Sequence, residues 1–362
     1  MRGLRRGPSR WSSSLVSLAA AVGLALAGVI GLAPATASPP TFGGLRAAPA
    51  PPADPSAMVA KVGPAVVDID TRMNYQSAVG AGTGIVLTPN GQVLTNNHVI
   101  EGATSITAVD IGNGQSYQAN VIGYDRNHDV AVLQLNGASG LTAATLGDSS
   151  RVAVGDPIIA MGNAEGAGGT PSAVPGNVTA LNQTVSAADS LTGSSETLNG
   201  LIAASTAIRP GDSGGPMVNS AGEVIGMNTA ASGNYQMAQP GGQGFAIPIN
   251  QARSIAGQIT GGNGSGSVHI GPSAFLGIGV ADASGEPGAE VKQVLPDTPA
   301  AKLGLSNDDV IVSVNGAPVN SATALTNLLD QHRPGDNVQL GWHKRGESVH
   351  TGNVTLAAGP PG

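Results

Sequence analysis

Residues 81–100 read AGTGIVLTPNGQVLTNNHVI, and this stretch carries the strongest fold signal in the chain. The turn sequence PNGQ separates the apolar runs GIVL and VLTN, and an Asn-Gly pair between such runs is typical of a β-hairpin. Short β-branched runs with glycine or asparagine turns recur on both sides, from AVVDID at 65–70 to GFAIPI at 244–249. Many short strands at this spacing predict an all-β fold, either one barrel or a pair of barrels.

The composition of the chain changes at residues 260–267, TGGNGSGS, which are typical of a flexible linker. Beyond it, strand-like runs alternate with two helix-like segments, which predicts a small α+β domain. Ser321 is the expected N-cap of one of these helices, Gly304 ends the other, and an earlier helix is expected at 250–259. The chain is therefore divided into a signal peptide (1–37), a Pro-rich spacer (38–55), a first domain (56–259), a Gly/Ser-rich linker (260–272) and a second domain (273–357).

The first residues have the features of a secretory signal. A basic start is followed by an apolar run from Leu15 to Leu32 and by small residues at Ala35 and Ala37, which is an A-x-A cleavage pattern. An uncleaved membrane anchor is the alternative, since the apolar run is near the length that spans a bilayer. The small residues and the Pro-rich sequence that follows favour cleavage after Ala37. We therefore expect an exported protein, extracellular or in the cell envelope.

Composition excludes several classes of function. The chain of 362 residues is 41% hydrophobic but only 2% aromatic, so its cores must consist of aliphatic side chains. Because there is no cysteine, disulfides, zinc–thiolate sites and a thiol nucleophile are excluded. The formal net charge of −7 makes nucleic acid and anionic membranes poor partners.

A single serine, Ser213, stands among three glycines in PGDSGG at 210–215. Serine is a weak nucleophile and needs a base, which in turn needs a carboxylate to orient it. His98 follows an expected strand and opens a short turn, and Asp129 leads into the strand DVAVLQL, with the nearby Asp125 as an alternative carboxylate. The order His98, Asp129, Ser213 is that of the chymotrypsin clan, so these residues are the candidate catalytic triad.

The glycines suit the same chemistry. Peptide hydrolysis passes through a tetrahedral oxyanion, which backbone N–H groups in a rigid loop can stabilise. Gly211 allows an unusual backbone turn, so that Gly211 and Ser213 can direct their amides inward. Gly214 and Gly215 are expected to leave room for the substrate.

Taken together, AGTGIVLTPNGQVLTNNHVI, DVAVLQL, PGDSGGP and GQGFAIPI resemble the HtrA/DegP family of exported serine proteases. The likeness covers about 56–357. It implies an all-β, chymotrypsin-like protease domain of two six-stranded barrels with the active site in the cleft between them. A small α+β PDZ domain, which binds the C-terminal ends of peptides, is implied at 273–357. The resemblance also places the triad on His98, Asp129 and Ser213, with Gly211 and Ser213 as oxyanion donors.

The resemblance has further implications for substrates and partners. It implies unfolded or misfolded polypeptide substrates, no metal or organic cofactor, and a homo-oligomer, since relatives are commonly trimers. The family's layout assigns an uncharged specificity pocket, which predicts cleavage after small or medium aliphatic residues, to Ala207, Ile208, Thr229, Ala230, Ala231 and Phe245. Its PDZ carboxylate-binding loop corresponds to Phe275, Leu276, Gly277 and Ile278.

Two positions depart from the family pattern. Asp212 stands where many members have Asn, and we expect its carboxylate to pair with a cation, such as Arg209, or with a backbone N–H. Ser205 stands eight residues before the nucleophile, where members often have Asp. A secreted serine endopeptidase is the favoured interpretation. The alternatives are a catalytically dormant peptide-binding chaperone or adaptor and a resting protease that a PDZ ligand or self-assembly activates.

Overall fold

The computed structural model describes residues 54–361, apart from 76, 190–194, 230–234, 237–241 and 345. The expected signal peptide and nearly all of the Pro-rich spacer lie outside these described residues. Within them, no helix has both the length and the apolar character needed to span a membrane.

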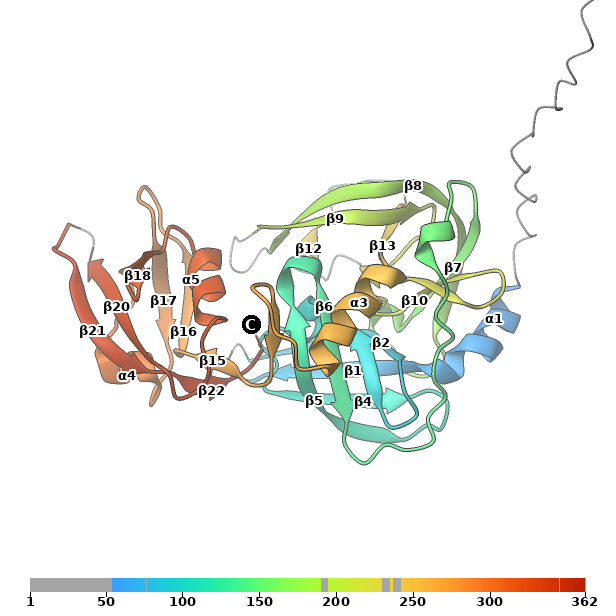
Figure 1. The fold of residues 1–362 in the computed structure, drawn as a ribbon, viewed down its shortest axis with the longest axis horizontal. Helices are drawn as coiled ribbons and strands as arrows, with labels where there is room; N and C mark the ends of the chain where they lie inside the picture. Colours follow the sequence, from blue (N-terminus) through green and yellow to red (C-terminus); the bar gives the residue numbers. More distant parts are fainter. Residues whose placement is uncertain are drawn as a thin grey trace, which may run out of the picture. The chain divides into compact units, whose positions relative to one another are not determined.

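A first β-barrel occupies the N-terminal part of the described chain (Figure 1). Its strands are β1 (Val66–Met73), β2 (Ala78–Val86), β3 (Gln92–Thr95), β4 (Ser105–Asp110), β5 (Ser116–Asp125) and β6 (Val130–Leu135). The sheet order is β4-β1-β2-β3-β6, and β5 pairs with both β4 and β6, so the six strands close into a ring. The interior is aliphatic, with Ile69 and Leu133 fully buried.

A second ring of antiparallel strands follows. Its strands are β7 (Pro157–Gly162), β8 (Ser172–Asp189), β9 (Ser195–Ala204), β10 (Pro216–Asn219), β11 (Val224–Thr229) and β13 (Gly244–Pro248). The order β8-β7-β10-β11-β13-β9 closes through pairing of β8 with β9, and the short β12 (Tyr235–Gln236) adds to β8 outside the ring. The predicted pair of six-stranded barrels is therefore confirmed.

The predicted hairpin at 81–100 is also confirmed. Strands β2 and β3 pair antiparallel, with Ile85 opposite Leu94. Gly91 takes the left-handed conformation with φ 88°, and its N–H donates to the Thr88 carbonyl at 3.0 Å. An L side chain rarely adopts this conformation, which is why the Asn-Gly turn signal was informative.

Helices are few and short. Helix α3 (Ile249–Thr260) confirms the helix expected at 250–259, and its buried face carries Ile249, Ala252, Ile255, Ala256 and Ile259. The other helical segments of the barrel region are α1 (Pro55–Val62), η1 (Gly63–Ala65), α2 (Asn97–Ile100), η2 (Arg126–His128), η3 (Ser149–Arg151) and η4 (Ala164–Gly166).

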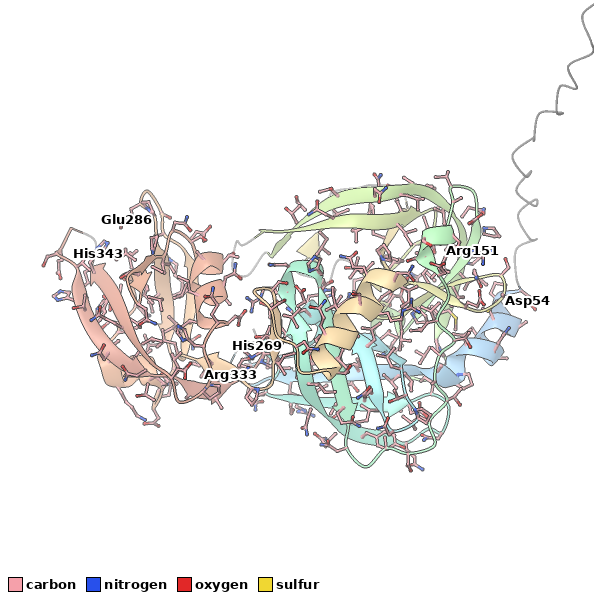
Figure 2. All side chains as sticks on the ribbon, viewed as in Figure 1. Asp54, Arg151, His269, Glu286, Arg333 and His343 are labelled. Carbon is pink, nitrogen blue, oxygen red and sulfur yellow. The ribbon has the colours of Figure 1, made fainter. Side chains whose placement is uncertain are left out.

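Sequence reasoning did not predict helix α1. Asp54, labelled in Figure 2, is its N-cap and accepts a hydrogen bond from the Ser56 N–H at 3.0 Å. Pro55 stands at the first helical position, where its missing N–H costs nothing. The Asp-Pro pair was the available signal, and Met58 and Val62 are the buried residues of the helix.

Part of the segment predicted as a linker is ordered strand. Strand β14 (Val268–Ile270) pairs with β5, with Val268 opposite Asp125, and extends the first sheet. The Val268 side chain is 5% exposed and joins an apolar cluster of the barrels. The glycine-rich composition ends just before these residues, and burial of Val268 together with the new strand pairing explains why they are not free linker.

The C-terminal domain has the predicted α+β composition. Its strands are β15 (Ser273–Phe275), β16 (Ile278–Asp282), β17 (Ala289–Val294), β18 (Asp309–Val314), β19 (Ala317–Pro318), β20 (Asn337–Lys344), β21 (His350–Thr355) and β22 (Ala357–Gly359). Its helices are α4 (Pro299–Leu303) and α5 (Ala322–Leu329). The main sheet has the order β16-β17-β18-β20-β21, which places β16 at an edge.

The predicted caps of these two helices are confirmed. The Ser321 hydroxyl accepts a hydrogen bond from the Ala324 N–H at 3.0 Å at the start of α5. Gly304 ends α4 with φ 88°. Helix α5 begins beside the end of β16, because the Ala322 N–H donates to the Asp282 carboxylate at 2.8 Å.

We expect Leu133→Ala to lower the free energy of unfolding by about 2–5 kcal/mol, because it leaves a cavity inside the closed first barrel. Val79 is 77% exposed, so Val79→Ala should change that free energy by about 0.5 kcal/mol or less. Urea unfolding, followed by circular dichroism in a Ser213→Ala background that removes the candidate nucleophile, measures both. Equal effects of the two variants would contradict the burial described.

Candidate active site

His98 and Asp129 come from separate elements of the first barrel and form one hydrogen-bonded pair. His98 lies in α2, directly after β3, and Asp129 lies between η2 and β6 in the left-handed conformation with φ 53°. The His98 Nδ1 is 2.9 Å from one Asp129 carboxylate oxygen and 3.0 Å from the other. The His98 backbone N–H also donates to this carboxylate, at 3.0 Å. Both residues are largely buried, so water screens the pair poorly.

This arrangement selects one tautomer of the imidazole. A carboxylate accepts hydrogen bonds, so Nδ1 must carry the proton and donate it toward Asp129. The lone pair is then on Nε2, which is the atom a general base needs. A carboxylate in this position also stabilises the imidazolium that forms when Nε2 accepts a proton, the second on the ring.

Thr229, at the end of β11 in the second barrel, makes a contact that sequence reasoning missed. Its hydroxyl donates to the Asp129 carboxylate at 3.1 Å and is buried. The layout of the family had suggested Thr229 as a wall of the specificity pocket. Together with Asn96, whose side-chain amide donates to the Asp129 carbonyl at 2.9 Å, it fixes the position of the carboxylate.

Asp125, the alternative carboxylate, faces a different histidine. It lies 2.8 Å from the Nδ1 of His128 and also accepts a hydrogen bond from the Ser267 hydroxyl at 3.1 Å. His98 therefore has Asp129, and not Asp125, as its carboxylate partner in the described structure.

Ser213 lies in a turn of the second barrel that packs against the first. We call residues 209–213 the oxyanion loop. The Ser213 carbonyl accepts the Thr83 N–H of β2 at 2.8 Å. A Cβ atom on the next residue, Gly214, would overlap with the Thr83 carbonyl and with the hydroxyl of Thr95, which stands just before α2 and His98.

The glycines of this turn are required by the protein's own backbone. A Cβ on Gly211 would overlap with the Asn163 carbonyl, and one on Gly215 would overlap with the Met161 carbonyl. Gly211 and Gly214 also have positive φ angles, of 94° and 83°. The expectation that Gly214 and Gly215 leave room for substrate is therefore corrected: neighbouring chain fills that space.

The orientation of the Gly211 amide follows from its neighbour. The Pro210 carbonyl accepts a hydrogen bond from the Glu165 N–H at 2.6 Å. In a trans peptide the C=O and the following N–H point in opposite directions, so the Gly211 N–H points away from Glu165. The direction of the Gly211 N–H is therefore set by the contact between Pro210 and Glu165.

Asp212 pairs with a backbone N–H and not with the side chain of a cation. Its carboxylate accepts the Arg209 backbone N–H at 2.9 Å and the Ser172 hydroxyl at 3.0 Å. The Arg209 guanidinium instead lies 3.7 Å from the Glu165 carboxylate at the surface. Burial raises the pKa of Asp212 above its ordinary value, and the Arg209 N–H acts in the opposite direction.

Other predicted site residues have simpler surroundings. The Ser205 hydroxyl bonds to the backbone of Asn177 in β8, as acceptor at 3.1 Å and donor at 3.3 Å. Ala207 is exposed, Ile208 is half-buried, and Phe245 is 5% exposed within an apolar core cluster. Ala230 and Ala231 lie outside the described residues.

The expected carboxylate-binding loop joins β15 to the edge strand β16. Phe275 ends β15 and stacks on Tyr75 with ring centroids 5.4 Å apart, and Leu276 is buried. Gly277 has φ 86°, and its carbonyl accepts the Leu295 N–H at 3.0 Å. Ile278 begins β16, which among the described residues pairs only with β17, so the four residues lead into an edge of the sheet.

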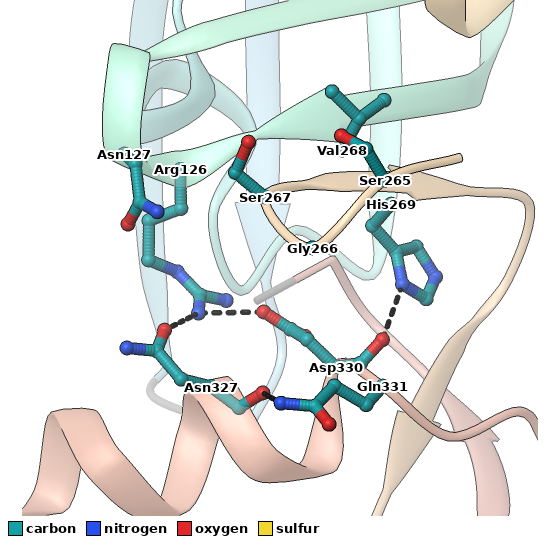
Figure 3. Close-up of a pocket in the computed structure, with 10 residues that line it drawn as sticks. All are labelled: Arg126, Asn127, Ser265, Gly266, Ser267, Val268, His269, Asn327, Asp330 and Gln331. Carbon is teal, nitrogen blue, oxygen red and sulfur yellow. Dashed lines mark hydrogen bonds and ion pairs between the residues drawn. The ribbon is translucent and has the colours of Figure 1, made fainter. Parts of the chain in front are cut away.

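A polar cavity of about 140 Å³ lies where η2 meets the end of α5 (Figure 3). Arg126 of η2 donates through Nη1 to the Asp330 carboxylate at 2.6 Å. The same carboxylate accepts the Tyr124 hydroxyl at 3.0 Å, and the Asp330 carbonyl lies 3.0 Å from the His269 ring. The segment directly before Asp129 is thus tied to the C-terminal domain.

We expect Asp212→Ala to lower kcat between about 10-fold and 100-fold, because the Arg209 N–H of the oxyanion loop and the Ser172 hydroxyl of β8 both lose their acceptor. Asp212→Asn should stay within about threefold, since its amide can accept from the Arg209 N–H and donate to Ser172. Steady-state hydrolysis of a fluorogenic peptide measures both variants. Unchanged activity in Asp212→Ala would show that this carboxylate does not support the loop.

Comparison with known proteins gives a consistent assignment. A Trypsin-like peptidase domain model matches residues 82–227, and a PDZ domain model matches 274–356. The chain is 35% identical to serine protease PepD of Mycobacterium tuberculosis, over 95% of this chain and 76% of that protein.

Two further relatives are longer than this chain. It is 36% identical to periplasmic pH-dependent serine endoprotease DegQ of Escherichia coli, over 76% of this chain and 59% of DegQ. It is 34% identical to periplasmic serine endoprotease DegP of Salmonella typhimurium, over 78% of this chain and 58% of DegP. The chain thus belongs to the HtrA/DegP family of serine endopeptidases, with a trypsin-like peptidase domain followed by a PDZ domain.

Proposed function

We propose that this protein is an exported endopeptidase in which Ser213 is the nucleophile, His98 the general base and Asp129 the group that orients His98. The observation that carries the proposal is the buried His98–Asp129 pair, which leaves Nε2 free of the proton. The glycine turn that holds Ser213 packs against the strand leading to His98.

The reaction follows from these groups. His98 Nε2 takes the Ser213 hydroxyl proton as the serine oxygen attacks the peptide carbonyl. The Gly211 and Ser213 N–H groups stabilise the oxyanion, and one such donor is typically worth about 2.7–4 kcal/mol in the transition state. His98 then protonates the leaving amine, which departs and leaves an acyl-enzyme on Ser213. Water, activated by the same histidine, hydrolyses it.

The substrates we propose are unfolded or misfolded polypeptides in the envelope or outside the cell. The apolar run and small residues before Ala37 support export. The uncharged character of Ala207, Ile208 and Phe245 supports cleavage after small or medium aliphatic residues. An apolar pocket discriminates by only about 1–3 kcal/mol per methylene, so the selectivity should be broad.

The PDZ domain is proposed to bind the C-terminal ends of peptides. A free edge at β16 is suited to β-addition of an extended peptide, and the turn at Gly277 lies at the end of this edge. The domain's Asp330 pairs with Arg126, close before Asp129 in the chain, which favours a protease that PDZ occupancy regulates over an independent binding module. A homotrimer is proposed from the family resemblance alone.

Fluorophosphonate labelling of residues 38–362 tests the nucleophile. We expect covalent labelling that is abolished in Ser213→Ala, because only an activated serine reacts with this reagent. An added peptide with a hydrophobic C-terminus should speed labelling if the PDZ domain regulates the site. Absence of labelling with and without the peptide would refute the enzyme assignment for these residues and favour a dormant peptide-binding chaperone.

Cleavage of a mixed peptide library tests the specificity. We expect cuts mainly after Ala, Val and residues of similar size, because the predicted pocket offers no carboxylate to a basic side chain. Mass spectrometry of the products identifies the cleaved bonds, and the Ser213→Ala variant provides the background. Preferred cleavage after Lys or Arg would overturn the pocket proposal.

A further inference from the structure

A buried carboxylate of the first barrel holds a loop of the second. Asp68 lies in β1, is 3% exposed, and accepts the Gly169 N–H at 2.9 Å through Oδ2. Its other oxygen, Oδ1, is buried and has no hydrogen-bond partner among the described residues. We call residues 163–171, which connect β7 to β8, the bracing loop. Asp68 is not part of the candidate triad, so its burial needs a separate explanation.

The bracing loop and the residue that directly follows it both contact the oxyanion loop. Near its start, the Glu165 N–H holds the Pro210 carbonyl at 2.6 Å and thereby sets the direction of the Gly211 N–H. Directly after it, the Ser172 hydroxyl holds the Asp212 carboxylate at 3.0 Å. A change in the position of the bracing loop must therefore move the peptide that donates to the oxyanion.

Thr83, a neighbour of Asp68, connects the bracing loop to the oxyanion loop. Thr83 of β2 lies directly opposite Asp68 in the strand register, so the two side chains share one face of the first barrel. The Thr83 hydroxyl donates to the Gly211 carbonyl at 2.7 Å and accepts the Asn163 N–H at 2.8 Å. The Asn163 side chain in turn accepts the Gly168 N–H at 2.6 Å, which closes the loop on itself beside Gly169.

We propose that Asp68 is a positioning residue for the oxyanion hole, whose ionised carboxylate anchors the bracing loop and so holds the Gly211 amide in its donating orientation. Asp68 acts through Gly169 and Glu165. This inference rests on the proposed roles of Gly211 and Ser213.

Titration of Asp68 makes the anchor dependent on pH. Burial raises the pKa of Asp68 to about 6, the N–H of Gly169 lowers it, and repulsion from Asp70 raises it. The Asp68 bond to Gly169 is charge-assisted above this pH and neutral below it, and charge-assisted bonds are roughly twice as strong.

Among the charged groups near Asp68, Asp70 is the one whose repulsion raises its pKa. The residues opposite Asp68 are Thr83 on β2 and Val109 on β4, neither of which titrates. The titratable residue of the bracing loop, Glu165, faces the Arg209 guanidinium at the surface. The same face of β1 continues outward with Asp70 and then Arg72, both exposed.

Stability alone does not require the charge. Because the pKa is raised above its ordinary value, ionisation of Asp68 costs folding free energy as the pH rises from about 4 through about 6. An asparagine of the same shape would accept the Gly169 N–H without that cost. A charged anchor that weakens the fold but strengthens one loop contact is the arrangement expected of a functional residue.

Asp68→Asn gives the direct test, with kcat and KM of the full mature chain measured on one peptide from pH 5 to pH 9. At pH 8 we expect kcat about fivefold below wild type with KM unchanged, because the oxyanion forms only in the transition state. The ratio of wild-type to variant kcat should fall to one as the pH drops through about 6. Any pH dependence that the two proteins share cancels in this ratio.

Asp70→Asn is the matched control on the same strand. It removes the repulsion on Asp68, so the pH at which the ratio falls should shift downward while kcat at pH 8 stays at the wild-type value. Circular dichroism shows whether Asp68→Asn folds. If it does not, the test becomes a comparison of Asp70→Asn with wild type, in which the pH at which kcat falls on the acid side is measured for both proteins. An acid limb that does not move then overturns the inference.

A ratio that is constant with pH, or a variant that changes only KM, also overturns the role of Asp68. If the wild type labels with fluorophosphonate and Ser213→Ala does not, either result refutes Asp68 alone. An unreactive wild type refutes the proposed function together with this inference.

Discussion

The constraint on which the site depends is the close backbone approach between the Ser213 turn of the second barrel and strand β2 of the first. Gly214 has no space for a Cβ because the Thr83 carbonyl of β2 occupies it, while Met161 and Asn163 of the second barrel confine Gly215 and Gly211 in the same way. The Thr83 N–H and hydroxyl then bond directly to this turn. Each barrel closes on itself, so the parts of the candidate active site meet through contacts between the barrels, of which this is one.

A second link between the barrels serves the base. Asp129 belongs to the first barrel, but Thr229 of the second donates to its carboxylate. His98 is therefore oriented by groups from both barrels, and any relative shift of the two would disturb the nucleophile and the base at once. The loops at residues 163–171 and 209–213 are hydrogen-bonded to each other, so a movement of the first would be passed to the turn that holds Ser213.

Sequence reasoning succeeded where the signal was local. The Asn-Gly turn predicted the β2–β3 hairpin, and the Ser321 cap predicted the start of α5. It failed where a local pattern had to compete with distant pairing: Val268 continues a glycine-rich stretch in the sequence but is buried beside β5. For the site, motif spacing identified His98 and Asp129, and the structure brings them into contact.

The sequence by itself determined the strand pattern, the glycine turn around Ser213 and the candidates for the triad, with Asp125 as the alternative to Asp129. Each of these depends on neighbouring residues or on a recognisable order of residues. Only the tertiary structure decided that Asp129 rather than Asp125 faces His98, that Thr229 supports it, and that Asp68 reaches Gly169. These contacts join residues that lie far apart in the chain or differ by a few positions. No local propensity encodes them, because the closure and packing of two barrels set the distances.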